Sequence, residues 1–300
     1  MRKFLFLLLA TLAWSASAET VVPVVWPFSL AGAQSNMTRQ IIDNANAAQT
    51  KYKFVYDNKP GAGGSVAVNS VIGAKELKVL VSTTSFYIRP VLYQNSYNPQ
   101  DFSLLARICA KQPFAVFSKK YKTVSDMVGK NASIGAIPGT MSQLVSLSMQ
   151  KHNNLAMIDI GYKGTPEAIG DVLGGHLDAS VDFFGPLTMA RFSERDNMHV
   201  LGITGDRNIA GLATFKSQNI KGLDALEVST LMFVKNTTDD AVKKELASIF
   251  SSAMNDQVKK TCVDDYGMFE KIPYESADIE HTRSINHWSQ FVPSLGIKAQ

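Results

Sequence analysis

The stretch Asp57-Asn58-Lys59-Pro60-Gly61-Ala62-Gly63-Gly64-Ser65-Val66-Ala67-Val68 connects a short apolar run to a segment with helical spacing. The apolar run, residues 54–56, is typical of a buried strand. Pro60 restricts the backbone, and three glycines within four residues allow a tight turn at φ values that other residues resist. Ser65 is placed to cap the helix that follows. The stretch therefore predicts a strand, a glycine turn and the start of a helix.

The glycine turn permits two interpretations. It is either a tight turn and nothing more, because glycine turns are common in loops, or a corner whose backbone N–H groups suit an anion or the close approach of another backbone segment. It is not a P-loop, since the Gly-Lys-Ser/Thr ending is missing, and it lacks the GxGxxG spacing of dinucleotide sites.

Strands and helices alternate around this stretch. Three successive predicted strands each end in a loop of small or hydroxyl residues that opens a helix, and the strands are residues 21–26, 54–56 and 77–81. The first helix is predicted over residues 37–49, with Ser35 or Asn36 as its cap. The alternation predicts a parallel α/β sheet, and in such sheets ligands bind outside the carboxyl ends of the strands.

A second set of such units follows. Its predicted strands are residues 132–136, 155–160, 179–182 and 200–204. Residues 228–234 form a further strand that is placed to cross back to the first set. We therefore predict two lobes, residues 19–105 with 230–300 and residues 106–229, with the ligand cleft between them.

The N-terminus has the form of a secretory signal peptide, residues 1–18. Arg2 and Lys3 precede an apolar core, and Ala16-Ser17-Ala18 is a small-residue cleavage site. We therefore expect a mature, soluble chain that begins at Glu19 and is exported to the periplasm of a Gram-negative bacterium. The formal net charge of +4 falls to +2 without Arg2 and Lys3, which is too small to favour nucleic acid as a partner. We expect a monomer.

Cys109 and Cys262 are the only cysteines. In an oxidising compartment they form either one disulfide that closes a long loop or two isolated buried thiols, and their spacing does not decide between the two. The sequence has five scattered histidines and neither a CxxC nor an HExxH motif, so it predicts no metal site. No cofactor is expected.

Several motifs share their order and spacing with one known family. The most specific are residues 58–64 (Asn-Lys-Pro-Gly-Ala-Gly-Gly), residues 162–166 (Tyr-Lys-Gly-Thr-Pro) and residues 173–178 (Leu-Gly-Gly-His-Leu-Asp) with Asp182. Weaker matches are residues 97–102, 213–215 and 295–298. Over nearly all of the mature chain, the sequence resembles the extracytoplasmic solute receptors of the tripartite tricarboxylate transporter family, also called Bug receptors.

The resemblance implies an α/β fold of the two-lobed type II periplasmic binding protein class, in which each lobe is a mainly parallel sheet flanked by helices and two crossover strands form the hinge. Such a receptor captures a small organic carboxylate in the interlobe cleft and delivers it to a membrane permease with one large and one small subunit. Backbone amides and hydroxyl groups, rather than a salt bridge, hold the ligand. Mapped onto this sequence, these loops imply as ligand-binding residues Phe28, Ser29, Gly32, Ala33, Gln34, Ser35, Asn36, Thr83, Thr84, Ser85, Gly139, Thr140, Met141 and Ser142. Further candidates for ligand binding are Arg89, Tyr162, Lys163 and Asp182.

The chain departs from the family pattern at the presumed pocket. The first loop reads Leu30-Ala31-Gly32-Ala33 in place of Ala-Pro-Gly-Gly, and Asn36 stands where the family has an Asp. Arg89 stands in place of a frequent Asn, and Gln143 in place of a frequent His. These departures bear on the identity of the ligand more than on its class.

Two side chains have competing interpretations. Arg89 either faces the cleft and pairs with a second ligand carboxylate or is a solvated helix residue. Asp182 either binds a ligand donor or holds a loop amide. Two rival functions are a receptor that feeds a two-component sensor kinase and a secreted α/β enzyme acting on a small anion. For the enzyme, Asp182 with Lys163 is the only candidate acid–base pair.

Overall fold

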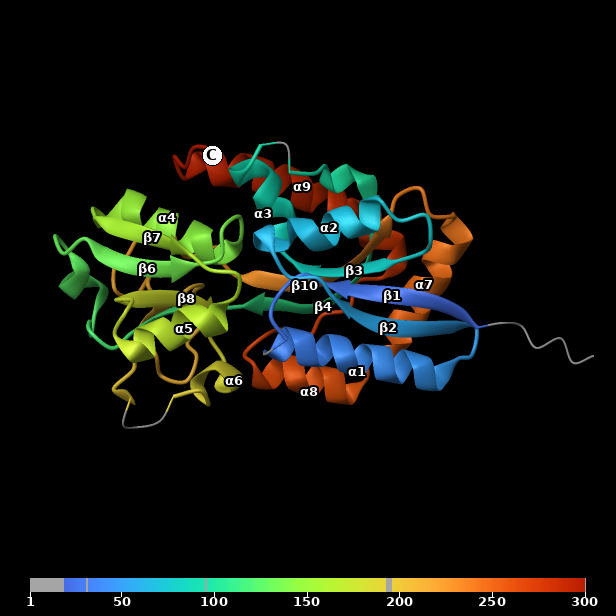
Figure 1. Ribbon diagram of the computed structural model, residues 1–300, viewed down its shortest axis with the longest axis horizontal. Helices are drawn as coiled ribbons and strands as arrows, with labels where there is room; N and C mark the ends of the chain where they lie inside the picture. Colours follow the sequence, from blue (N-terminus) through green and yellow to red (C-terminus); the bar gives the residue numbers. More distant parts are fainter. Residues whose placement is uncertain (1–18, 31, 95, 193–195, 300) are drawn as a thin grey trace, which may run out of the picture.

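The computed structural model describes residues 19–30, 32–94, 96–192 and 196–299, so the predicted signal peptide lies outside the described residues. The described residues form two five-stranded sheets flanked by helices, which lie side by side along the long axis of the molecule (Figure 1). This arrangement confirms the predicted α/β, two-lobed fold class. No helix in the described part of the chain is long and apolar enough to cross a membrane.

The first sheet has the spatial order β2-β1-β3-β10-β4. Its strands are β1 (Thr20–Trp26), β2 (Tyr52–Asn58), β3 (Val79–Thr83), β4 (Phe102–Gln112) and β10 (Val228–Lys235). β1 pairs in parallel with β2 and β3, whereas β10 is antiparallel to both of its neighbours. All five residues of β3 are buried, as expected of a central strand with helices on both faces.

The second sheet has the spatial order β7-β6-β8-β5-β9. Its strands are β5 (Phe114–Ser118), β6 (Ala132–Ala136), β7 (Met157–Gly161), β8 (Ala179–Phe183) and β9 (His199–Ile203). β6 pairs in parallel with β7 and β8, and β5 is antiparallel to β8 and β9. We call the part built on the first sheet the first lobe and the part built on the second sheet the second lobe.

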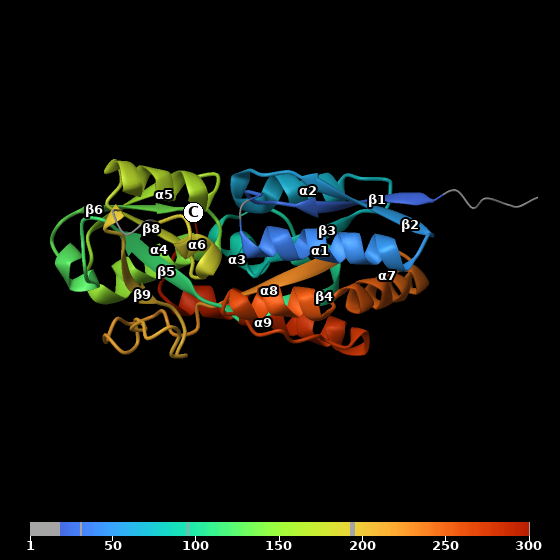
Figure 2. The ribbon, with the colours of Figure 1, turned by 90° about the horizontal axis from the view of Figure 1, so that it is seen from below.

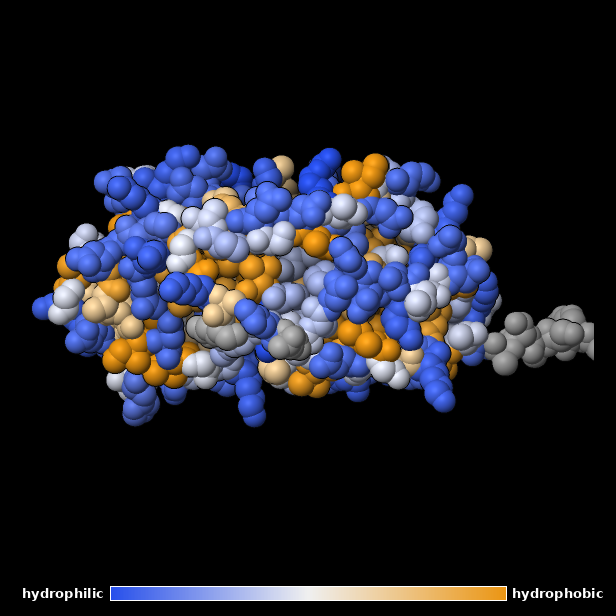
Figure 3. All heavy atoms as spheres, turned by 90° about the horizontal axis from the view of Figure 1, so that it is seen from above, coloured by the Kyte–Doolittle hydropathy of each residue, from blue (hydrophilic) through white to orange (hydrophobic). Residues whose placement is uncertain are grey.

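Helices cover both faces of each sheet (Figures 1 and 2). Those of the first lobe are α1 (Ala33–Ala48), α2 (Ser65–Ile72), α3 (Ser85–Leu92), α7 (Asp240–Ala253), α8 (Asp256–Asp264) and α9 (Ala277–Ser294). Those of the second lobe are α4 (Met141–Asn153), α5 (Thr165–Gly174) and α6 (Pro186–Met189). Phe86 fixes α3 on the first sheet, because its ring stacks on Phe233 at 4.3 Å and meets Phe102 edge-on at 5.3 Å. On the face in Figure 3 hydrophilic side chains predominate, and hydrophobic ones gather in separate patches.

Two helix starts differ from the prediction. α1 begins at Ala33, with Gly32 at the N-cap and no side-chain cap, so the prediction of Ser35 or Asn36 as the cap is wrong. Gly32, at φ 142° and ψ 163°, turns the chain directly into the helix, and the Ser35 hydroxyl instead bonds Tyr56 Oη at 2.9 Å. Ser65 is the first residue of α2 rather than its cap, because Gly64 occupies the N-cap in the left-handed region.

The glycine turn is a place where two backbone segments approach closely. Gly63, in the short 3₁₀ turn Ala62–Gly64, lies so near the Pro138 carbonyl oxygen of the second lobe that a Cβ there would overlap it. Gly139 is equally close to the Arg89 guanidinium of the first lobe. Of the interpretations of this turn, the close approach of another backbone segment is therefore the one that the structure contains.

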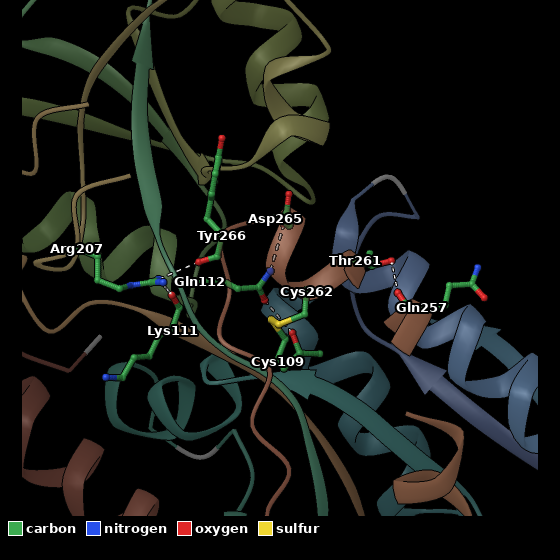
Figure 4. Close-up of a disulfide and its surroundings, with 10 residues drawn as sticks. Cys109, Lys111, Gln112, Arg207, Gln257, Thr261, Cys262, Asp265 and Tyr266 are labelled. Carbon is green, nitrogen blue, oxygen red and sulfur yellow. Dashed lines mark hydrogen bonds between the residues drawn. A yellow bond between two sulfur atoms is a disulfide. The ribbon is translucent and has the colours of Figure 1, made fainter. Parts of the chain in front are cut away.

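The strands that cross between the lobes pair with each other, and a disulfide joins one of them to α8. β4 and β10 pair from Phe102 opposite Lys235 to Gln112 opposite Val228, and Pro113 alone separates β4 from β5. Cys109 of β4 and Cys262 of α8 form a disulfide, with 5.7 Å between their Cα atoms (Figure 4). The disulfide alternative for the two cysteines is therefore confirmed.

Candidate functional site

A cavity lies between the two lobes, at the carboxyl ends of β1, β3, β6 and β8. Its lining residues are Trp26, Phe28, Ser29, Gly32, Ala33, Gln34, Thr83, Ser85, Phe114, Ile137, Thr140, Ser142, Gly164, Thr165, Asp182, Phe183, Thr188, Arg191 and Asp265. The volume open to the centres of water molecules is about 50 Å³. A single water needs about 10–15 Å³ by this measure, so this conformation has room for only a few small groups.

The start of α1 forms one wall of the cavity. Because no side chain caps this helix, its first backbone N–H groups and the positive end of its dipole are available to a bound anion. Gln34, only 4% exposed, also lines the cavity, and its Nε2 has no hydrogen-bond partner among the described residues. A buried amide donor without a partner costs stability, and an acceptor on a ligand would remove that cost.

The hydroxyl residues of the wall bond to backbone groups, and one of them, Ser85, joins the two lobes. Ser85 Oγ, in the first lobe, accepts a hydrogen bond from the Met141 backbone N–H of the second lobe at 3.1 Å. Ser142 Oγ accepts from the Ile137 N–H at 2.9 Å, and Thr140 caps α4 by accepting from the Ser142 N–H at 3.3 Å. Ser85 therefore ties the two halves of the wall together, whereas Ser142 and Thr140 order the loop that precedes α4.

Two buried carboxylates and one guanidinium form an acidic corner of the cavity, which consists of Asp182, Asp265 and Arg191. Asp182 accepts from the Phe183 N–H at 2.7 Å and from Arg191 Nη1 at 3.1 Å, and burial raises its pKa to about 6 although Arg191 lowers it. Asp265 accepts from Gln112 Nε2 at 3.3 Å (Figure 4). Burial, and then the charge of Asp182, raise the pKa of Asp265 to about 7.

The structure brings ten of the predicted site residues to the cavity wall. They are Phe28, Ser29, Gly32, Ala33, Gln34, Thr83, Ser85, Thr140, Ser142 and Asp182. The other eight, which do not line it, are Ser35, Asn36, Thr84, Arg89, Gly139, Met141, Tyr162 and Lys163. Asn36 lies in a neighbouring surface groove, and Tyr162 Oη donates to Asp171 at 2.6 Å. Lys163 is exposed, so it does not pair with Asp182 in the cavity as the enzyme hypothesis requires.

Sequence reasoning missed several residues of the wall. Gly164 and Thr165 belong to the Tyr-Lys-Gly-Thr-Pro motif and could have been found there. Trp26, at the end of the strand predicted at residues 21–26, also lines the cavity, with its ring 5.6 Å from that of Phe28. Arg191 and Asp265 belong to no motif, and only the folded chain places them beside Asp182.

Arg89 joins the two lobes outside the cavity. Its Nε donates to Ser65 Oγ in the first lobe, and its Nη1 donates to the Pro138 carbonyl oxygen of the second lobe at 3.1 Å. Its guanidinium also stacks on Tyr93, 4.8 Å from the ring centre. It is therefore not a solvated helix residue, and its hydrogen bonds are to protein groups.

We expect the Arg89→Met variant to bind monocarboxylates and dicarboxylates equally less tightly, by about 3- to 10-fold. The variant keeps the aliphatic stem but loses the hydrogen bond that joins the lobes, at a cost of about 1 kcal/mol. Isothermal titration calorimetry with one acid of each kind measures the two losses. A loss confined to dicarboxylates would instead place the guanidinium on the ligand.

Comparisons with known proteins find the same fold in solved structures. BugD, a periplasmic binding protein of known structure, is 20% identical with a TM-score of 0.82, over 94% of this chain and 99% of its own. MatC from Rhodopseudomonas palustris with bound malate is 18% identical with a TM-score of 0.76, over 91% of this chain and 98% of its own. Rpa4515 from the same species, with adipate, is 16% identical with a TM-score of 0.79, over 96% of this chain and 100% of its own. At these identities the likeness shows a shared fold.

Sequence comparison extends the likeness from fold to family. A family profile described as the tripartite tricarboxylate transporter family receptor matches residues 37–287. The match includes every strand of both sheets except β1. It also includes the starts of α4 and α5 and all three residues of the acidic corner. The chain therefore belongs to the tripartite tricarboxylate transporter family of receptors, whose members bind solutes rather than transform them.

Proposed function

We propose that this receptor captures a small organic carboxylate in the cavity between its lobes and delivers it to a membrane permease of the tripartite tricarboxylate type. The observation that carries the proposal is the uncapped start of α1 together with the unpartnered Gln34 amide, both at the cavity wall. Charge-assisted hydrogen bonds from these groups are the kind that hold a carboxylate. The malate and adipate bound by two proteins of the same fold support the same ligand class.

Binding would work by closure of the lobes. Both lobes supply the wall, so a ligand gains all of its contacts only when they come together. We assign residues 19–112 with 228–299 to the first lobe and residues 113–227 to the second. This division moves the boundary predicted at residue 106 to Pro113, because β4 belongs to the first sheet throughout. The hinge would then lie at Pro113 and near Val228.

We also propose that the protein acts in the periplasm as a monomer, after removal of residues 1–18. The disulfide supports an oxidising compartment. In this proposal the closed, liganded form is what the large and small permease subunits recognise. Co-purification with those subunits in the presence and absence of ligand would test this step. Capture by a sensor kinase instead would favour the rival receptor function.

The first experiment is native mass spectrometry of the mature protein, followed by a melting-temperature screen against organic acids. We expect a 1:1 complex with one small carboxylate, which raises the melting temperature through preferential binding to the folded state. A protein that is unchanged by mono-, di- and tricarboxylates and by aromatic acids would contradict the proposal.

A further inference from the structure

The acidic corner carries a negative charge that the residues of the cavity wall do not balance. Asp182 and Asp265 are 2% and 5% exposed, and Arg191 is the only cationic side chain that lines the cavity within the described part of the chain. An unbalanced buried charge is costly and is relieved by a proton or by a cation. With both buried carboxylates ionised, the wall thus lacks one positive charge beside them.

Among the described residues, the charged groups of the neighbouring surface groove do not supply it. Asp265 also borders a surface groove that contains Arg39, Asp43 and Asp264. The Arg39 guanidinium lies over the Tyr56 ring at 4.3 Å, and Asp264 is paired with Lys260. This groove therefore adds no net positive charge to the acidic corner.

Asp265 is held firmly in this position. Gln112 Nε2 donates to its carboxylate, and Gln112 Oε1 accepts from Thr230 Oγ1 at 3.3 Å, so both crossing strands support it. Its Oδ1 lies against Gly185, where any Cβ would overlap it. The carboxylate therefore reaches the cavity only because residue 185 has no side chain, and the cost of burying it calls for a ligand partner.

At Gln34 the cavity offers a hydrogen-bond donor, whereas the acidic corner offers acceptors. The buried, unpartnered Nε2 of Gln34 needs an acceptor, and the acidic corner needs a donor with positive charge. The same cavity thus presents complementary groups for both ends of a molecule that carries a carboxylate and an amine. A plain dicarboxylate would satisfy Gln34 but would add negative charge beside Asp182 and Asp265.

We propose that the ligand is a small amino acid-like zwitterion, with its carboxylate at Gln34 and the start of α1 and its ammonium group at Asp182 and Asp265. This inference rests on the proposed function, which it narrows from carboxylates to carboxylates that carry an amine. The raised pKa values of both aspartates are consistent with it, because an ammonium group would restore their charged forms.

The test compares ligands that differ only at one substituent. L-aspartate, L-malate and succinate carry an ammonium, a hydroxyl or a hydrogen at C2, and L-alanine, L-lactate and propionate repeat the series without the second carboxylate. Isothermal titration calorimetry on the mature protein should show the amine member of at least one series binding ten-fold or more tightly than its two analogues. This comparison needs no variant.

Asp265→Asn tests the residue assignment, with Asp264→Asn as the matched control on the next, exposed position. We expect Asp265→Asn to weaken the amine ligand at least ten-fold and to change its analogues by less than three-fold, and Asp264→Asn to change neither. Melting temperature and circular dichroism establish that both variants fold.

Two results would overturn the proposal. The first result is that malate or succinate binds more tightly than aspartate and that Asp265→Asn leaves this affinity unchanged or improves it. Asp182 and Asp265 would then share a proton and donate it in a hydrogen bond to a carboxylate of the ligand. In that case the carboxylate receptor stands and only the zwitterion is wrong. If no member of either series binds and the wider acid screen is also negative, the proposed function fails together with this inference.

Discussion

Replacing Cys109 and Cys262 together with alanine is expected to lower the free energy of unfolding by about 3–5 kcal/mol. The disulfide joins residues 153 positions apart, and in the chain-entropy account closing a loop of that length restricts the unfolded chain by about 5 kcal/mol. Both cysteines are fully buried in the first lobe. Urea unfolding followed by tryptophan fluorescence measures the change.

The unmodified protein unfolded with and without a reductant provides the control. The reduced protein should unfold at the same urea concentration as the double alanine variant, apart from the small loss of the sulfur atoms from the core. A difference of less than about 1 kcal/mol between the oxidised and reduced forms would contradict the expectation. It would mean that the unfolded chain is already restrained near Cys109 and Cys262 without the bond.

Gly32→Val is expected to weaken binding of the identified ligand by at least 100-fold, or about 3 kcal/mol. At φ 142° and ψ 163° residue 32 occupies a region that is open essentially to glycine alone. A valine would force the loop to rearrange, and α1 would then begin at another position. The first-turn N–H groups and Gln34 would move with it, and affinity is measured by titration calorimetry.

Gly129→Val is the matched control for this variant. Gly129 also has a positive φ, of 71°, and a Cβ built there would meet nothing within 4 Å. We expect it to lower the melting temperature through backbone strain but to leave affinity within two-fold. Unchanged affinity in Gly32→Val would place the carboxylate away from the start of α1 and would contradict the assignment of this wall.

The strands could be predicted from the sequence because each is a local apolar run. Residues 132–136 were predicted and are β6, since small and apolar residues there are bounded by turn residues on both sides. Helix starts were harder to predict. Ser35 and Asn36 are residue types that commonly cap helices, but α1 begins before them, because Gly32 adopts a positive φ and is the N-cap. A glycine's conformation is not encoded in its neighbours.

In the candidate site, too, residues with a local sequence signal were predicted, and residues placed by tertiary structure were not. The loops after β1, β3 and β6 were found because strand ends, glycines and hydroxyl residues mark them in the sequence. Asp265 was not found, because it reaches the cavity through tertiary structure, at the end of a helix that the disulfide fixes to β4. Arg89 was predicted to face the ligand or to be solvated, but it bonds a serine and a carbonyl oxygen outside the cavity, and these partners carry no sequence signal.

The close approach of the lobes at Gly63 and Gly139 restricts which sequences can keep this fold closed. Their φ values of 57° and 77° lie in the left-handed region, which asparagine also adopts, so each turn by itself would tolerate Asn. The facing lobe opposes it, because a Cβ would overlap the Pro138 carbonyl oxygen at residue 63 and would displace the Arg89 side chain at residue 139. Glycine at both positions therefore serves one shared requirement. In an alignment of relatives that close in the same way, substitutions at the two positions should occur together rather than independently.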